Sequence, residues 1–313
     1  MKIKNMESLR QRTLADEISA EGIGLHTGRQ VHLTFKPAPE NYGITFRRTD
    51  IPGSREIPAL SKFVVDTSLA TTLGRDGIRV STVEHCCAAI HAMGIDNLRV
   101  EVDAPEIPIF DGSALPFVRM IQRVGVAVQR AMKEFIVIRR PVAVGDKDKS
   151  ARLSPANRFG MRCRIDFNHP LISNQVIDIN CNAFNFCREI ACARTFGFLK
   201  DIEMLKNAGL AKGGSVENAI VVDGFSILNP DGLRFADEFV RHKALDAVGD
   251  ILMLGHPLIG HLELNKSGHA LNHVLVEKVL SDPSCYEVIR ATPAEMARIE
   301  TTLPAFKAAE VLV

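Results

Sequence analysis

The sequence shows the same order of secondary-structure signals in each of its halves. Within residues 81–125, a helical pattern that ends at Gly94 precedes a strand, a glycine-containing turn and a second helical pattern. Residues 239–280 give this order again, with Gly255 ending the first helical pattern. Short strand-like segments come before each set. Residue identity between the halves is faint, so the repeat is one of pattern. It predicts a duplicated α+β unit whose two sheets enclose a layer of helices, a β-α-α-β sandwich.

We therefore expect two similar domains, each a mostly antiparallel sheet with helices. The 313 residues suit two domains of about 150 residues each. The N-terminal domain is predicted to span residues 1–130 and the C-terminal domain residues 134–282. Residues 283–313 form an extension to which no role is assigned. If the halves are duplicates, the helices that begin near Ser81 and Phe239 are counterparts and face each other across a pseudo-twofold axis.

The first half contains an alternating run and a helix start. Residues 12–48 alternate apolar and polar side chains between Gly- and Pro-containing turns, which predicts an antiparallel meander. Ser81 followed three residues later by Glu84 favours a capping box at the start of a helix. In that box the Glu84 carboxylate would bond to the backbone.

Composition excludes several classes of protein. The net charge of +1 argues against binding to nucleic acid or to an anionic membrane surface. Seven cysteines, an odd number with no C-x-x-C pair, suit reduced thiols better than a disulfide framework. No signal peptide and no apolar run of about 18 residues is visible. We expect a cytoplasmic protein without a membrane-spanning segment, and a monomer.

Residues 239–250, FVRHKALDAVGD, carry the clearest chemical signal. His242 and Asp246 stand four residues apart, so a helix presents both side chains on one face, one turn apart. An imidazole and a carboxylate at this spacing commonly bind a divalent metal, most often zinc. Asp250 adds a carboxylate one turn further, and the Lys243 cation could meet an anionic substrate. The alternative is an ordinary exposed pair on a helix surface.

The helix that begins near Ser81 is the place to look for a third ligand. His85 could complete a His, His, Asp set, and Glu84 could then act as general base on a metal-bound water. The capping box is the alternative role for Glu84. His269 is a further candidate, because Asp250 could orient its ring and favour its protonated form. Its alternative is a histidine of a helix first turn that faces water.

Several motifs in order resemble one family. They are GIGLHTG (22–28), STVEH (81–85), DGSALPF (111–117), DFNHP (166–170), ARTFGF (193–198), RHKALDAVGD (241–250) and SGHALNH (267–273). Over roughly residues 10–285 the chain resembles the UDP-3-O-acyl-N-acetylglucosamine deacetylases, zinc amidases of lipid A biosynthesis. The resemblance implies hydrolysis of the N-acetyl group of a UDP-sugar lipid, with release of acetate, in a two-domain α+β sandwich.

The resemblance also implies a role for each matched residue. His85, His242 and Asp246 would hold Zn²⁺, and Glu84 would activate its water. His269, held by Asp250, would be the charged acid or oxyanion stabiliser; Glu84, His269 or both in relay would protonate the leaving amine. Thr195 would polarise the acetyl carbonyl, and Lys243 would contact the substrate.

The resemblance further implies a hydrophobic passage for the acyl chain, formed by an inserted segment at about residues 198–221. Four side chains are expected to line it: Leu199, Ile202, Val216 and Val221. Phe196 and Leu25 would lie near its entrance. The alternative function is a protein that keeps the fold and metal in a non-catalytic role or hydrolyses a different amide. An open metal position argues against a purely structural metal, which normally has four protein ligands.

Overall fold

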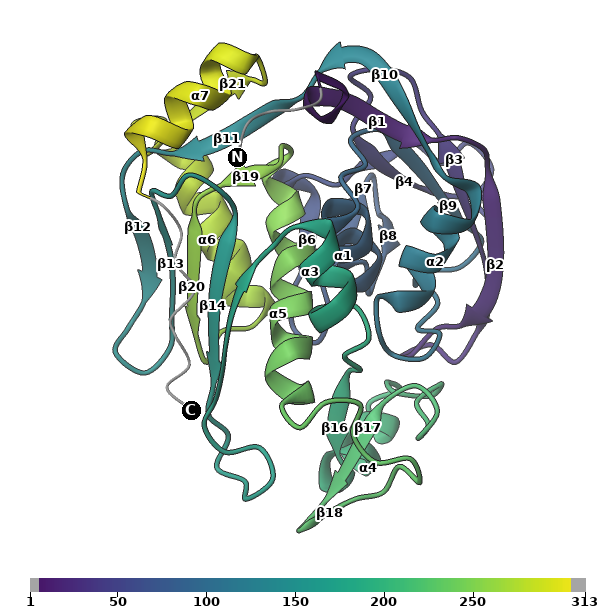
Figure 1. Ribbon diagram of the computed structural model, residues 1–313. Helices are drawn as coiled ribbons and strands as arrows, with labels where there is room; N and C mark the ends of the chain where they lie inside the picture. The colour runs from purple at the N-terminus through teal and green to yellow at the C-terminus, as the bar shows by residue number, and fades with distance from the viewer. Residues whose placement is uncertain (1–5, 305–313) are drawn as a thin grey trace.

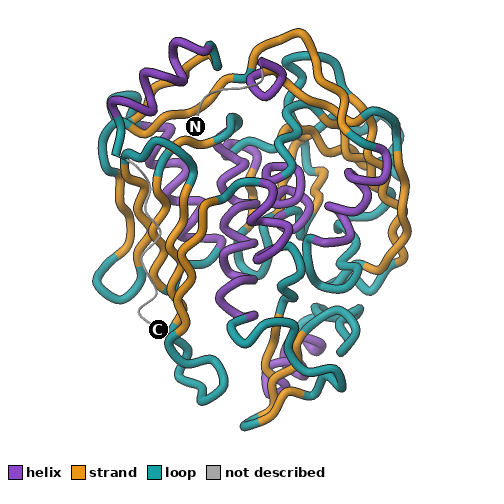
Figure 2. The backbone as a smooth tube through the Cα atoms, in the orientation of Figure 1, coloured by secondary structure: helices purple, strands orange, loops and turns teal. Residues whose placement is uncertain are grey.

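The computed structural model describes residues 6–304, in which two five-stranded sheets enclose a layer of helices (Figure 1). Figure 2 shows helices in the middle of the molecule and strands on both sides. Buried side chains from both sheets and from the helices form one continuous hydrophobic core. The predicted α+β sandwich is confirmed. The domain boundaries at residues 130–134 and 282–283 stay a prediction.

The two large sheets have the same topology. The first has the order β2 (Ile18–Ile23), β3 (Gln30–Pro37), β9 (Leu98–Val102), β4 (Ile44–Arg48) and β5 (Ile57–Pro58). The second has the order β12 (Val142–Gly145), β13 (Ser150–Ser154), β20 (His261–Asn265), β14 (Gly160–Ile165) and β15 (Gln175–Asn180). In each sheet the third and fourth strands are parallel, and the other neighbours are antiparallel. Such agreement of strand order is what a duplicated unit predicts.

The predicted meander over residues 12–48 is wrong. Only β2 and β3 form a hairpin, because β9 lies between β3 and β4. The strand β1 (Arg10–Leu14) leaves this sheet and pairs with β10 (Val126–Met132). Alternate residues of β9 are fully buried, namely Leu98, Val100 and Val102, which is the pattern of a strand that packs one face on the core. The alternating pattern identified the strands but not their partners.

Four long helices lie between the sheets: α1 (Glu84–Ala92), α2 (Leu115–Val124), α5 (Glu238–Ile251) and α6 (His269–Ser281). The helices α1 and α5 pack side by side at the centre (Figure 1). Small residues permit this close approach, and a Cβ atom added at Gly249 of α5 would collide with the carbonyl oxygen of Glu84. The predicted glycine stops hold, since Gly94 and Gly255 have φ of 70° and 87° just past the helical segments.

The predicted capping box at Ser81 is wrong. The helix α1 begins at Glu84 without a side-chain cap. The hydroxyl groups of Ser81 and Thr72 share a hydrogen bond of 2.8 Å instead. Between them and the helix, Thr82 has a φ of 58°, a left-handed conformation that is unusual for a β-branched residue. This turn separates Ser81 from the helix and frees the Glu84 side chain for another use.

Three small sheets complete the structure. The first joins β6 (Val64–Asp66), β7 (Thr72–Arg75) and β8 (Ile78–Val80). The second belongs to the predicted insertion and joins β16 (Phe196–Phe198), β17 (Ile220–Asp223) and β18 (Ser226–Ile227), with α4 (Leu199–Asn207) packed against them. The third has the order β19 (Leu258–Ile259), β11 (Glu134–Ile138) and β21 (Tyr286–Arg290). The remaining elements are short: η1 (Met6–Leu9), η2 (Ser61–Phe63), α3 (Ala183–Asn185), η3 (Phe186–Ile190) and η4 (Leu252–Leu254).

The C-terminal extension is partly structured. Its strand β21 pairs with β11, and its helix α7 (Pro293–Thr302) buries Ile299 against Val137 and Ile289. Residues 305–313 of the predicted extension lie outside the described residues. All seven cysteines are free thiols. No helix in the described range 6–304 combines the length and the apolar character needed to cross a lipid bilayer.

Candidate active site

Three buried side chains from the central helix pair meet at one point. His85 comes from α1, and His242 and Asp246 come from one face of α5. One ligand atom of each lies within 4.8 Å of the other two. The Nε2 atoms of His85 and His242 are 3.5 Å and 3.4 Å from Oδ1 of Asp246. The helices α1 and α5 thus bring together residues that are about 160 positions apart in the sequence.

These side chains fit a divalent metal. Oδ1 of Asp246 is buried and accepts no hydrogen bond from the described residues, although a buried carboxylate oxygen normally has a partner. Ligands about 2.0–2.1 Å from a tetrahedral zinc ion stand roughly 3.3 Å apart. The two distances from Oδ1 to the imidazole nitrogens are close to this spacing. The group can therefore bind a metal ion with little rearrangement.

The protonation states suit metal binding. Burial lowers the pKa of His242 to about 3, so its imidazole is neutral at neutral pH. Its Nδ1 lies 3.1 Å from the carbonyl oxygen of Ala193, which directs Nε2 toward Asp246. Burial raises the pKa of Asp246, but His242 and Lys243 outweigh that effect and hold it well below its ordinary value. Lys243 donates a hydrogen bond of 2.6 Å to Oδ2 of Asp246.

Glu84 lies beside this group with its side chain fixed. Its Oε2 accepts a hydrogen bond of 3.0 Å from the backbone amide of Thr71. Its Oε1 is 3.9 Å from Nε2 of His269. Burial raises the pKa of Glu84, which His269 and His85 partly offset. A carboxylate with a raised pKa next to a set of candidate metal ligands has the properties of a general base.

His269, at the first turn of α6, is held by Asp250 of α5. Its Nδ1 lies 2.9 Å from Oδ2 of Asp250, which directs Nε2 toward Glu84 and Asp246. Burial alone would lower the pKa of His269, but the charge and hydrogen bond of Asp250 raise it to about 9. Asp250 also accepts hydrogen bonds from the Thr71 hydroxyl (2.6 Å) and the Asn272 amide (2.8 Å). The arrangement favours a charged imidazolium.

A cavity of about 250 Å³ opens over these groups. Nine of the predicted site residues line it: Glu84, His85, His242, Lys243, Asp246, His269, Thr195, Phe196 and Leu25. Asp250 does not line it and lies behind His269. A second cavity, of about 610 Å³, shares Lys243, His269 and Phe167 with the first and adds Lys149 and Lys266. The two cavities therefore meet at Lys243 and His269, beside the three candidate metal ligands.

The four side chains expected to line an acyl passage do not border the catalytic cavity. Leu199 and Val216 are 39% and 40% exposed, and Ile202 is partly buried. Val221 is buried in β17. All four belong to the insertion, whose β16 strand begins at Phe196 on the cavity wall. The insertion thus begins at the cavity wall and exposes apolar side chains on its own surface.

Sequence reasoning missed several polar residues that support the site. Thr71 and Asn272 bind Asp250, and Glu106 binds the loop that contains Leu25. The fully buried Glu238 binds the guanidinium group and the backbone amide of Arg194, next to Thr195. None of these contacts has local spacing that would indicate it. Among the supporting residues that sequence reasoning missed, only Arg194 and Asn272 fall within the motifs that carry the resemblance.

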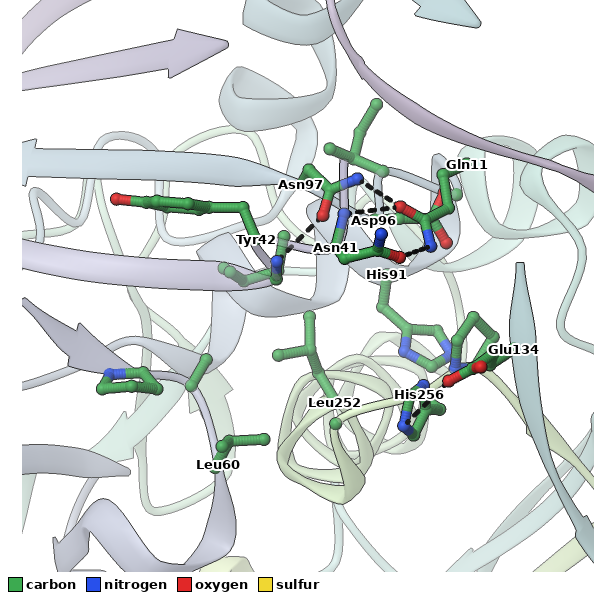
Figure 3. Close-up of a pocket in the computed structure, with 18 residues that line it drawn as sticks. Gln11, Asn41, Tyr42, Leu60, His91, Asp96, Asn97, Glu134, Leu252 and His256 are labelled. Atoms are coloured by element: carbon green, nitrogen blue, oxygen red, sulfur yellow. Dashed lines mark hydrogen bonds and ion pairs between the residues drawn. The ribbon is translucent and has the colours of Figure 1, made fainter. Parts of the chain in front are cut away.

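A separate cavity of about 270 Å³ lies at the other ends of α1 and α5 and shares no lining residue with the catalytic cavity. In Figure 3 the side chains of His91, Glu134 and His256 lie on one side of it. The hydrogen-bonded side-chain amides of Gln11, Asn41 and Asn97 lie on the other side. Nε2 of His256 is 3.9 Å from Oε2 of Glu134. Burial, with the charge of Lys133, lowers the pKa of His91 to about 4.

Comparison with known proteins agrees with this geometry. A sequence model of the UDP-3-O-acyl N-acetylglycosamine deacetylase family matches residues 11–281. The UDP-3-O-acyl-N-acetylglucosamine deacetylase of Myxococcus xanthus (strain DK1622) is 60% identical over 289 residues, which cover 92% of each chain. That of Anaeromyxobacter dehalogenans (strain 2CP-C) is 54% identical over 96% of this chain and 97% of its own. That of Saccharophagus degradans (strain 2-40 / ATCC 43961 / DSM 17024) is 49% identical over 95% and 98%.

Proposed function

The chain belongs to the UDP-3-O-acyl N-acetylglycosamine deacetylase family, and we propose that it hydrolyses the N-acetyl group of UDP-3-O-acyl-N-acetylglucosamine, releasing acetate, in lipid A biosynthesis. The observation that carries this proposal is the convergence of His85, His242 and Asp246 beside Glu84 and His269. A metal site, a carboxylate base and a histidine acid around one cavity are the groups that amide hydrolysis uses.

We propose zinc as the metal and His85, His242 and Asp246 as its ligands. Two imidazoles and a carboxylate are a common catalytic zinc set, which leaves the fourth position to water. When bound, zinc would polarise the acetyl carbonyl and lower the pKa of its water to about 7. The neutral His242 and the unpartnered Asp246 oxygen support this assignment.

Glu84 is proposed as the general base. Its Oε2 is engaged by the Thr71 amide, so Oε1 is the oxygen that remains to take a proton from the attacking water. His269 is proposed as the acid. With Nδ1 bonded to Asp250, its Nε2 is the atom that can hand a proton to the leaving amine and stabilise the negative charge that forms on the carbonyl oxygen. The distance of 3.9 Å between Nε2 of His269 and Oε1 of Glu84 supports a role for both groups in one reaction.

Thr195 and Lys243 are proposed to contact the substrate. Thr195 lines the cavity, and its backbone is fixed by hydrogen bonds to the Gly112 carbonyl (2.8 Å) and from the Ile220 amide (2.7 Å). From this position its hydroxyl would donate to the acetyl carbonyl oxygen. Lys243 borders both cavities. Its ammonium group has three donors, of which Asp246 takes one, so others remain for an anionic group.

The rest of the substrate is assigned from shape and charge. The larger cavity offers Lys149, Lys243 and Lys266 beside the Phe167 ring, which suits the diphosphate and base of a UDP group. The apolar surface of the insertion, with Leu199 and Val216, suits the acyl chain. Each buried methylene of that chain would contribute about 0.8 kcal/mol to binding. A substrate without it should therefore bind far less well.

The experiment that tests this function combines metal analysis with an acetate-release assay. Purified protein is assayed with UDP-3-O-acyl-N-acetylglucosamine as isolated, after chelation and after Zn²⁺ is restored, with UDP-N-acetylglucosamine as the substrate control. We expect acetate release that follows bound zinc up to about one ion per chain, as for a single three-ligand site. Bound metal without acetate release would contradict the proposal and favour a non-catalytic role or a different amide substrate.

A further inference from the structure

Glu106 is a buried glutamate that lies behind two segments of the catalytic cavity wall, and the mechanism does not use it. Its side chain is 1% exposed. Its Oε2 accepts hydrogen bonds of 2.9 Å from both the amide and the hydroxyl of Thr27. Its Oε1 accepts from the amide of His26 (2.9 Å) and the hydroxyl of Thr82 (3.0 Å). Four neutral donors thus converge on one carboxylate.

The first segment held by Glu106 is the loop at residues 24–28, here called the cavity loop. It is closed by hydrogen bonds from Gly28 to the Gly24 carbonyl and from Gly24 to the Arg29 carbonyl, both 2.9 Å long. A Cβ atom at Gly24 would collide with Oε2 of Glu106, so the loop rests directly on the carboxylate. Leu25 and His26 of this loop line the cavity. Glu106 therefore fixes part of the cavity wall.

The cavity loop in turn supports the insertion. The amide of Gly213 donates to the carbonyl of Leu25 (3.0 Å), and the amide of Lys212 donates to that of His26 (3.3 Å). A side chain at Gly213 would collide with the carbonyl oxygen of Gly24. Residues 211–214, here called the docking turn, thus touch the loop backbone to backbone. Any shift of the loop is passed to the insertion, because no flexible side chain separates them.

The second segment held by Glu106 leads into the catalytic helix. Thr82 stands two residues before Glu84 and has a φ of 58°. A β-branched residue keeps this conformation only where its surroundings hold it, and the hydrogen bond from its hydroxyl to Glu106 is one such restraint. One carboxylate therefore connects the start of α1 with the cavity loop and, through it, with the docking turn.

We propose that Glu106 is a positioning residue that sets the spacing between the cavity loop and the docking turn, and so determines how well the site accepts the acyl chain of its substrate. This inference rests on the proposed function for the identity of that chain. Glu106 does not line the catalytic cavity, and its hydrogen-bond partners are His26, Thr27 and Thr82 and not the proposed metal ligands. A carboxamide cannot replace its carboxylate, since the NH₂ group would face donors.

The test is Glu106→Gln, with Glu21→Gln as the matched control. Glu21 lies on β2, the strand that leads to the cavity loop, and its side chain is 69% exposed. Two readouts are taken: kcat/KM for acylated and non-acylated UDP-N-acetylglucosamine, and amide hydrogen exchange at Lys212 and Gly213. We expect the ratio of acylated to non-acylated kcat/KM to fall about tenfold or more, mainly through KM, as for loss of hydrogen bonds to a charged group. Exchange at the two amides should become faster, and Glu21→Gln should change neither readout.

An equal loss with both substrates, or unchanged exchange at the docking turn, would overturn the inference. If the wild-type protein releases no acetate, the proposed function fails, and the exchange comparison still decides whether Glu106 positions the two segments. Should Glu106→Gln not fold, Thr27→Val removes a single donor at similar volume, and Thr27→Ser restores the hydroxyl. The valine variant should then lower the ratio and the serine variant should recover it; no difference between them would also contradict the inference.

Discussion

The backbone amide of Thr71 donates a hydrogen bond of 3.0 Å to the carboxylate of Glu84. The hydroxyl of the same residue donates to Asp250 at 2.6 Å, and Asp250 holds His269. One residue with 3% exposure therefore fixes the carboxylate proposed as base and, through Asp250, the imidazole proposed as acid. It reaches both because it lies just before β7 (Thr72–Arg75), outside the helices that carry those groups.

Replacing Thr71 by valine should lower activity without loss of metal. The substitution keeps the backbone bond to Glu84 and removes the hydroxyl bond to Asp250. Hydrogen bonds to charged groups contribute about 1.5–3 kcal/mol, so we expect kcat/KM to fall about 10- to 150-fold. Thr71→Ser keeps the hydroxyl and serves as the control. Steady-state kinetics with metal analysis would check this, and equal activity of the two variants would remove Thr71 from the supporting set.

Glu84→Ala should separate chemistry from metal binding. The variant should retain its zinc and its fold, while kcat falls by roughly 10²–10⁴, the usual range for loss of a general base. Glu277→Ala, on the exposed side of α6, should keep wild-type activity. Full activity of Glu84→Ala in the acetate-release assay would exclude the proposed role.

Asp246→Ala should give the opposite result. The variant loses one of three proposed ligands and should retain much less metal after dialysis. Asp237→Ala, at the start of the same helix, removes a carboxylate that pairs with Arg241 instead and should keep its metal. Metal content measured for the three proteins decides the matter. An unchanged zinc content in Asp246→Ala would remove this residue from the ligand set.

His91 should make the fold sensitive to acid. Its pKa is about 4 in the folded protein, below the ordinary value of 6.5, because burial disfavours the charged form. Between these pH values the unfolded chain binds a proton that the folded protein does not, so the free energy of unfolding falls as the pH falls from 6.5 to 4 and is unaffected above 6.5. His91→Gln should reduce this loss by about 1–3 kcal/mol.

Urea unfolding of the wild type, His91→Gln and His32→Gln at pH 7.5 and 4.5 would measure this difference. His32 is 49% exposed and serves as the control. The same loss of stability on acidification in all three proteins would show that His91 does not titrate as expected.

The local spacing of residues predicted much of this structure. The pairing of strands that are distant in the sequence was the main feature that it did not predict. The spacing of His242 and Asp246 on one helix face and the glycines at positions 94 and 255 depend on neighbours within two turns, and these expectations agree with the structure. The insertion of β9 between β3 and β4 depends on residues 54 to 69 positions apart, which no local pattern records.

The site divides in the same way. The motif residues that meet around the metal group were visible as polar side chains at helical or turn positions. Thr71 and Glu106 were not, because their hydrogen-bond partners are distant in the sequence: the Thr71 hydroxyl donates to Asp250, and Glu106 accepts from Thr27. The Ser81 capping box failed because the left-handed Thr82 turns the chain before the helix begins. The residue type at position 82 does not indicate this left-handed conformation.

The absence of a side chain at Gly249 has a consequence for the metal group. The backbones of α1 and α5 touch at this position, one helix carrying His85 and the other His242 and Asp246. Any change in the distance between α1 and α5 therefore also changes the distances between the ligand atoms. A substitution that pushes the two helices apart would first weaken metal binding. It would destabilise the fold only at a larger displacement.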